Sequence, residues 1–527
     1  MNKRIARKKF SWDVLVFGAL CLMLLAAPLM RGLFYNLEFL QAQIFLAGTL
    51  GLLALIRVFQ RTKRIKISLQ DILVVIFVAA YALTPLWAVH HKEAVMGVYR
   101  VIGCAVIYFL ATHLTAGDRR RNTLFGVIFT ATVLVSLAAF LAAVGFMGLE
   151  LGGEFASSKR MASTLEYMNT FAIFVALGVI LGFGLWQRAR SVIARSVIAA
   201  GIYLNVLGAM ATQSRGSWLM LALGLIILFV AIGRKALIPY IFRLCIVFIA
   251  AAVSGKGFMD AFLLDENGAF IFWLVLGLIT VIVLAAVEGA LPRLWQKMRM
   301  PQLFQQALVV SLLVILAVTF GTYFSYTGKH LPNPAGEMLA VDVIERAATI
   351  GGQDSSFQGR MEMKNTAWAL IKDHPMGTAE GGWEAWYHNY QDRLYWSSEV
   401  HDHFLQIWVE GGTIAFLAYS AFWIVLFWQI IRKLISYIRE EEDYPNGPLL
   451  AAAAVAALIL LLHSAFDFDL SLTAVAFILW ALAGALANEI EEPLWQREQK
   501  LPAPIMPLVL LGMAVLLFFP AVKELPA

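Results

Sequence analysis

The sequence predicts an all-α fold, a polytopic integral membrane bundle of helices with one large external loop that contains short helices. Three observations indicate this fold class. Hydrophobic residues make up 60% of the 527 residues and charged residues only 14%, and the mean hydropathy is +0.75. Long apolar runs recur along almost the whole chain. A single polar stretch of roughly 75 residues interrupts them, far longer than an ordinary connection. A water-soluble domain of this length would carry many more charged residues.

Candidate membrane spans occur along most of the chain. A helix crosses a hydrocarbon core of about 30 Å with about 20 apolar residues, and the sequence offers about 14 such runs. By residue number they are 12–30, 39–57, 70–88, 94–113, 123–147, 165–186, 196–212, 216–232, 237–253, 270–288, 305–325, 408–431, 449–466 and 470–488. A run at 505–522, with Pro507 and Pro520 inside it, is a further candidate that would bring the total to about 15.

Lysine and arginine predict the orientation of these spans. The N-terminal segment is basic, and so is every second connection after it, which places the N-terminus in the cytoplasm under the positive-inside rule. These connections are 57–66, 118–122, 187–195, 233–235, 293–299 and 432–439. The polar stretch then falls on the external side of a multi-pass membrane protein.

Charge and cysteine usage exclude other classes of protein. The net charge of +6 is explained by orientation in a bilayer, and no basic patch has the spacing of a nucleic-acid motif. Cys21, Cys104 and Cys245 all lie inside apolar runs. We expect them to be buried side chains rather than a disulfide framework or a metal site.

The chain is predicted to consist of five regions. They are N-terminal membrane helices (1–159), central membrane helices with outer arginine motifs (160–325), the external loop (326–403), C-terminal membrane helices (404–488), and a cytoplasmic linker with a possible final span (489–527). Seven tryptophans and tyrosines between 368 and 396 indicate that the loop is ordered. A helix is expected near 359–372, because apolar residues recur at helical spacing and a His-Pro pair follows.

Two arginines are candidates for binding an anion. Arg215, in TQSRGSWL, stands at the outer mouth of a span, where a guanidinium must be hydrated, paired or bound to an anionic ligand. The hydroxyl of Ser214 beside it could bind the same oxyanion. Arg360 opens the expected loop helix, and together the two arginines suit a diphosphate. Alternatively, Arg215 is an interface anchor and Arg360 pairs with a neighbouring carboxylate.

Two polar clusters contain histidine. In HDHFLQ, His401 and His403 are two positions apart and would point about 200° apart on a helix, so only one faces a given site. The spacing does not say which one, although Asp402 or Glu399 could orient a catalytic base there. In LHSAFDFDLSLT, Asp467 belongs to a second outward-facing cluster, whose alternative explanation is a turn with charged caps.

These motifs, in this order, resemble the O-antigen ligase and polymerase family. The elements are RMASTLEYMNTFA, TQSRGSWL, PMGTAEGG and HDHFLQIWVEGGTIAF. In the first, Arg160 is followed nine residues later by Asn169, as in the family's outer-loop pattern. The chain departs from the pattern at Asp402, where asparagine is usual, at Ser163, where glycine is usual, and at Met168, where proline is usual.

The resemblance implies a metal-independent membrane glycosyltransferase with no cofactor. The protein would lie in a bacterial plasma membrane. Its substrates would be an undecaprenyl-diphosphate-linked glycan donor and an acceptor hydroxyl at the outer face of that membrane. The transfer would invert the anomeric centre. His401 would be the base, and Arg215 and Arg360 would act at the diphosphate. Arg160, Asn169, Ser214, Asp402 and Asp467 are the expected substrate-binding residues. Histidine suits this role because its unperturbed pKa is about 6.5.

Other functions remain open at this point. The acceptor could be a glycan, a lipid or a protein, so a repeat-unit polymerase or a protein O-oligosaccharyltransferase fits the same motifs. A transporter or flippase for lipid-linked glycans belongs to another class, and it would show internal repeats and charged residues near the middle of the bilayer. Here the polar residues gather at the outer rim instead.

Overall fold

A computed structural model describes residues 12–60, 64–146, 159–297, 355–440, 446–490, 493–500 and 504–524, together with positions 311 and 502. These residues form sixteen α-helices and one two-stranded sheet. The helices are α1 (Asp13–Ala26), α2 (Asn36–Gln60), α3 (Leu69–Leu83), α4 (His91–Leu114), α5 (Asp118–Ala143), α6 (Met168–Arg188), α7 (Val192–Thr212), α8 (Arg215–Ala231), α9 (Arg234–Leu263), α10 (Asn267–Lys297), α13 (Ser355–Asp373), α14 (Gly382–Trp386), α15 (His403–Glu440), α16 (Gly447–Ser464), α17 (Thr473–Ala487) and α18 (Ile505–Glu524). The strands are β1 (Arg64–Ser68) and β2 (Gln496–Lys500).

The helices confirm a multi-pass helical membrane protein. Within the described residues, eleven helices are long and apolar enough to cross a membrane. Three further apolar segments are shorter, and they contain α1, α8 and α17. The run at 505–522 forms one of the eleven, because α18 continues through Pro520 to Glu524. The expected span at 305–325 lies outside the described residues.

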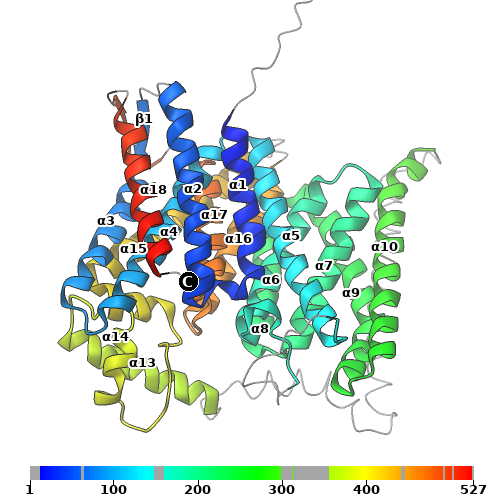
Figure 1. The fold of residues 1–527 in the computed structure, drawn as a ribbon. Coiled ribbons are helices and arrows are strands. Elements are labelled where there is room, and N and C mark those ends of the chain that lie inside the picture. The colour runs from blue at the N-terminus through cyan, green and yellow to red at the C-terminus, as the bar shows by residue number, and fades with distance from the viewer. Residues whose placement is uncertain are drawn as a thin grey trace, which may run out of the picture.

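The helices pack side by side in one bundle (Figure 1). Helices α6, α16 and α17 are almost wholly buried, whereas α10 and α18 lie at its periphery. Much of α16 is alanine, and such small residues let helices approach closely where the solvent is lipid rather than water. The C-terminal helix α18 packs against α2, so both ends of the described chain lie in the same part of the bundle.

The two strands correct the expectation of a purely helical chain. β1 and β2 pair antiparallel, from Arg64 opposite Lys500 to Ser68 opposite Gln496. Ser68 then begins α3 through a reciprocal cap, in which its side chain accepts from the Asp71 N–H and the Asp71 carboxylate accepts from the Ser68 N–H. The strands lie at the end of the bundle opposite α13, where the basic connections also gather (Figure 1).

The described part of the predicted external loop is ordered. Its helix α13 begins at Ser355, four residues before the expected 359–372, and ends at Asp373, one residue after it. Helices α13 and α14 lie together at one end of the bundle (Figure 1). The loop has a small hydrophobic core of its own, in which Trp383 and Tyr387 are fully buried and stack at 5.2 Å between ring centroids. This core packs on the first turns of α15 through Leu405 and Val409.

Candidate functional site

Residues 375–382, the PMGTAEGG element, dock against a break in α15. The helix breaks at Gly412, where φ is 78° and ψ is 178°. Main-chain carbonyls of α15 before the break accept from the N–H groups of Thr378, at 2.8 Å, and Ala379, at 2.9 Å. A Cβ atom at Gly377 would lie only 2.4 Å from a main-chain oxygen of α15, so this approach requires glycine. The two glycine-containing motifs therefore form one joint that fixes the loop against the membrane helix.

His401 lies just before α15 rather than within it. The helix begins at His403, and His401 has a φ of 56°, in the left-handed region. Such a conformation costs a residue other than glycine about 1–3 kcal/mol and is concentrated at functional sites. His401 and His403 do face different sites, as the sequence indicates. The reason is the left-handed backbone at His401 before the helix begins, and not the spacing of the two residues on one helix.

Asp402 supports the helix and does not orient His401. Its Oδ1 accepts from the backbone N–H groups of Phe404, at 3.0 Å, and Leu405, at 3.1 Å, which is an N-cap. Its Oδ2 lies 2.8 Å from Lys364 Nζ. The expectation that Asp402 orients the base is therefore wrong, and its role as a substrate ligand stays a prediction.

Asp467 is the carboxylate that contacts His401. Its Oδ1 lies 3.2 Å from His401 Nδ1, and its Oδ2 accepts from Arg360 Nη2 at 2.9 Å. Tyr167 and Asn169 each donate to it at 2.9 Å. Burial raises the pKa of the Asp467 carboxyl, but the hydrogen bond from His401 and the charge of Arg360 outweigh it and hold that pKa well below its usual range. Asp467 therefore stays ionised at neutral pH and joins the two predicted clusters into one site.

Arg160 belongs to the same network. Its Nη2 donates to Asn169 Oδ1 at 3.3 Å, and its Nε donates to the Thr212 carbonyl at 2.6 Å. Ser163, at the position where the family has glycine, has a φ of 58°, the region that glycine favours. The structure therefore places Arg160, Asn169, Arg360, His401 and Asp467 in a continuous set of contacts.

Ser214 and Arg215 begin α8 next to a second histidine network. The Ser214 hydroxyl is buried and lies 3.1 Å from the hydroxyl of Ser217. Ser217 Oγ lies 3.1 Å from Nε2 of His463, whose Nδ1 lies 2.7 Å from Asp469. Arg215 is the first residue of the helix and is partly exposed. Sequence reasoning assigned Ser214 to substrate binding, and the structure places its hydroxyl within this buried network.

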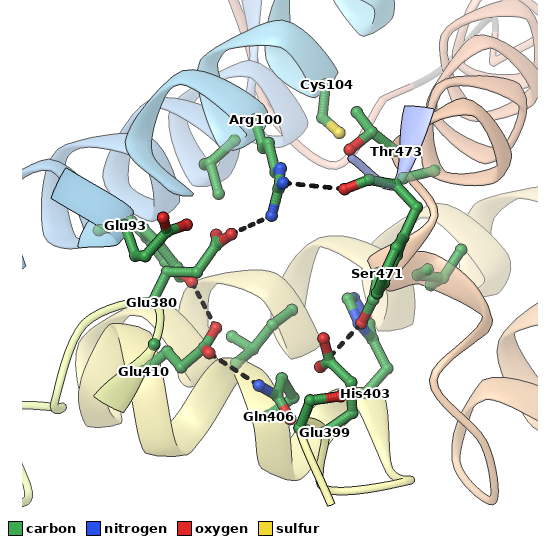
Figure 2. Close-up of a pocket in the computed structure, with 18 of the residues that line it drawn as sticks. Glu93, Arg100, Cys104, Glu380, Glu399, His403, Gln406, Glu410, Ser471 and Thr473 are labelled. Atoms are coloured by element: carbon green, nitrogen blue, oxygen red, sulfur yellow. Dashed lines mark hydrogen bonds and ion pairs between the residues drawn. The ribbon is translucent and has the colours of Figure 1, made fainter. Parts of the chain in front are cut away.

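The face of the α15 N-terminus that carries His403 and Glu410 lines a cavity of about 400 Å³ (Figure 2). His403 and Glu410 lie along that wall together with Gln406, as helical spacing predicts. Glu399 lines it too and accepts from Ser471 at 3.1 Å. His401 is not part of its lining. The segment from 399 to 403 therefore contributes to two neighbouring sites.

Several residues of these sites were not predicted. Tyr167 lies inside the RMASTLEYMNTFA motif, and nothing in the sequence indicates that its hydroxyl contacts Asp467. Lys364 is one α-helical turn after Arg360 and could have been found by that spacing. Arg100 and Glu380 form an ion pair between α4 and the loop, and no local pattern joins them.

The fold and these contacts define a class: a multi-pass helical membrane protein with a histidine–aspartate pair and arginines at one end of its bundle. A family model described as O-Antigen ligase matches residues 261–420. This match supports the assignment of the chain to the O-antigen ligase/polymerase family, in agreement with the motifs. Members of that family are membrane glycosyltransferases, which supports an enzymatic role. The match includes Arg360 and His401 but not Arg160, Arg215 or Asp467. No curated protein matches the chain.

Proposed function

We propose that this protein transfers a glycan from an undecaprenyl-diphosphate carrier to an acceptor hydroxyl at the outer face of a bacterial plasma membrane. The observation that carries the proposal is the contact of His401 with buried Asp467, which also binds Arg360. This arrangement brings a candidate base, His401, together with a candidate anion-binding residue, Arg360, at the end of the bundle that carries α13. The basic connections lie at the opposite end, which supports the external assignment of the site.

His401 would act as the general base through Nε2. When Nδ1–H donates to the Asp467 carboxylate, the ring takes the tautomer in which Nε2 accepts a proton. The acceptor hydroxyl gives its proton to Nε2 while its oxygen attacks the anomeric carbon of the donor. The bond from that carbon to the diphosphate oxygen breaks, and its electron pair leaves with the undecaprenyl diphosphate. In-line attack of this kind inverts the anomeric centre.

The arginines would stabilise the departing diphosphate. The Arg360 side chain is 28% exposed, and its contact with Asp467 uses Nη2, one part of a guanidinium that carries five N–H donors. Arg160 and Arg215 are both partly exposed near the same end of the bundle. Fixed positive charges placed where negative charge develops lower the barrier to departure. The diphosphate is thereby activated without a metal ion.

An in vitro transfer assay tests this function. The purified full-length protein receives a defined undecaprenyl-diphosphate glycan and, in parallel, a lipid, a polysaccharide and a peptide acceptor. We expect free undecaprenyl diphosphate and a glycosylated acceptor with inverted anomeric configuration, at a rate unchanged by a chelator. The productive acceptor identifies a ligase, a polymerase or a protein oligosaccharyltransferase. Movement of intact donor across vesicles without transfer would instead support the flippase and contradict the proposal.

A further inference from the structure

We propose that the cavity beside His401 is the acceptor site, and that it takes a neutral or amino-bearing sugar and rejects an anionic one. This inference rests on the proposed function, because it assigns the second substrate of the same transfer. The cavity lies between the loop element 379–384, the N-terminus of α15 and the ends of α2, α3, α4 and α17 (Figure 2).

The size and walls of the cavity suit a sugar. Its volume of about 400 Å³ lies in the range of small-ligand sites, about 300–1,000 Å³. Tyr81, Tyr419 and Trp480 supply aromatic surface to the lining, on which the apolar faces of a sugar ring can pack. Polar groups lie beside this aromatic surface, where Glu410 accepts from Tyr81 at 2.8 Å and from Gln406 at 2.7 Å.

The lining of the cavity is rich in carboxyl groups. Its lining contains one arginine, Arg100, and five glutamates, which are Glu93, Glu380, Glu384, Glu399 and Glu410. Arg100 pairs with Glu380 and donates to Asn36 at 3.0 Å, while its Nε has no hydrogen-bond partner among the described residues. An anionic ligand would therefore meet several carboxyl groups and a single arginine that already pairs with one of them. Carboxylates accept hydrogen bonds from sugar hydroxyls and form charge-assisted bonds with ammonium groups.

Two further observations indicate an organic ligand. His403 lines the cavity, and its Nδ1 is buried with no hydrogen-bond partner in the described part of the chain. Within the described residues, no three His, Cys, Asp or Glu side chains are placed to hold a metal ion together. The carboxylates are thus spread around the cavity wall, as hydrogen-bonding groups for an extended ligand would be.

The cavity lies next to the proposed base. Only three residues separate Glu399 from His403, both of which line the cavity. His401 is the middle one of the three, and it turns toward Asp467. Ser471, also in the lining, lies four residues after Asp467 on the same connection. A sugar held in the cavity would therefore lie beside the segment that carries His401. The opposite charges of the two sites would also keep the diphosphate out of the acceptor site.

A cysteine-reactivity experiment tests the proposal in the full-length protein. In a background of Cys21→Ser, Cys104→Ser and Cys245→Ser, Ser471→Cys places a thiol in the cavity. Asn389→Cys, on the exposed loop surface, is the matched control. Each variant is treated with methanethiosulfonates that carry either a trimethylammonium or a sulfonate group. We expect the ratio of cationic to anionic reaction rates to be about 10-fold higher at position 471 than at position 389.

Occupation of the cavity should then block the acceptor only. We expect complete modification at position 471 to abolish glycan transfer, while binding of undecaprenyl diphosphate changes by less than about 2-fold. Equal rate ratios at the two positions, or full transfer after complete modification, would overturn the acceptor site. Failure of the proposed function looks different, because the unmodified wild-type protein would then show no transfer at all.

Discussion

The two sides of the segment 399–403 differ in charge, although they are built from adjacent residues. On one side His401 meets Asp467 among the arginines, which suits a diphosphate. On the other side Glu399 and His403 line a cavity rich in glutamates, which suits a sugar. The comparison teaches that one short polar cluster in a sequence can contribute to two neighbouring sites when a helix begins inside it.

Buried carboxyl groups on the two sides respond to their surroundings in opposite ways. Burial raises the pKa of Asp467, but its cationic neighbours outweigh burial and lower that pKa below its usual range. Burial also raises the pKa of Glu399, and the nearby charge of Glu380 adds to the effect, so that the pKa reaches about 7. Neighbouring charge therefore decides which carboxyl is a permanent anion and which one can titrate.

The largest expected effect comes from removing the base. We expect His401→Ala to lower the transfer rate about 10²- to 10⁴-fold, because general-base catalysis contributes that much. Donor binding should be retained, since the arginines remain. Turnover and equilibrium binding of the donor are measured on the same purified variant, with exposed His388→Ala as the control. A transfer rate near that of the wild type would contradict the assignment of the base.

The next effect tests the orienting carboxylate. We expect Asp467→Asn to lower kcat about 10²-fold, because the amide no longer fixes the required histidine tautomer or stabilises its protonated form. A merely structural role would not move the pH–rate profile. Here the pH–rate profile should change together with kcat, because the neutral amide no longer stabilises the protonated form of the histidine.

Asp469→Asn is the matched control for this substitution. It changes the carboxylate that contacts His463, on the same connection between α16 and α17. We expect it to affect stability but to leave the pH–rate profile unchanged. A shift of equal size in both variants would assign the effect to the connection rather than to Asp467.

The sequence predicts much of the bundle because each span is specified locally. Apolar length predicts the membrane helices, and basic residues indicate one end of them. The β1–β2 pair was missed because its partners are more than 400 residues apart and QREQK looks like a charged linker. Nothing in either segment indicates the other.

The site was predictable as a set of residues but not as a set of contacts. His401, Arg360 and Asp467 were each selected by type and position, yet the nearest carboxylate in the sequence, Asp402, caps the helix instead. A contact between residues 66 positions apart depends on how α16 and α17 place their connection. The acidic cavity is harder still, because its walls come from five helices and the loop.

A smaller effect is expected from a substitution in the glutamate-rich cavity. We expect Glu410→Gln to raise KM for the acceptor about 10-fold and to change kcat little, because an amide NH₂ replaces a carboxyl oxygen that accepts a buried hydrogen bond from the sugar. Steady-state kinetics with the donor held at saturation measure this. The matched control is Glu362→Gln on α13, where Glu362 lies 3.2 Å from Arg393, away from the cavity. An unchanged KM for the acceptor would remove Glu410 from the acceptor site.

The smallest expected effect is the pH dependence of the cavity. The pKa of Glu399 is raised to about 7, so this carboxyl is mostly ionised at pH 8 and mostly protonated at pH 6. The charged groups around it are Glu380, Glu384 and Arg100. Ser471 donates to Glu399 and lowers this pKa, so Ser471→Cys moves the titration upward. In that variant we expect the ratio of cationic to anionic reagent rates to fall about 3-fold from pH 9 to pH 6, as one negative charge is lost.

This ratio of reagent rates reports the charge of the cavity without the titration of the introduced cysteine. Both reagents react with the same thiolate, so the titration of the introduced cysteine cancels between them. Glu399→Gln should lower the ratio at pH 9 and make it independent of pH over this range. A ratio that still changes in that variant would assign the titration to Glu380, whose pKa is also raised by burial. A ratio that is flat in the parent variant would mean that Glu399 keeps its usual pKa, and that the two sides of the segment differ less than their neighbouring charges indicate.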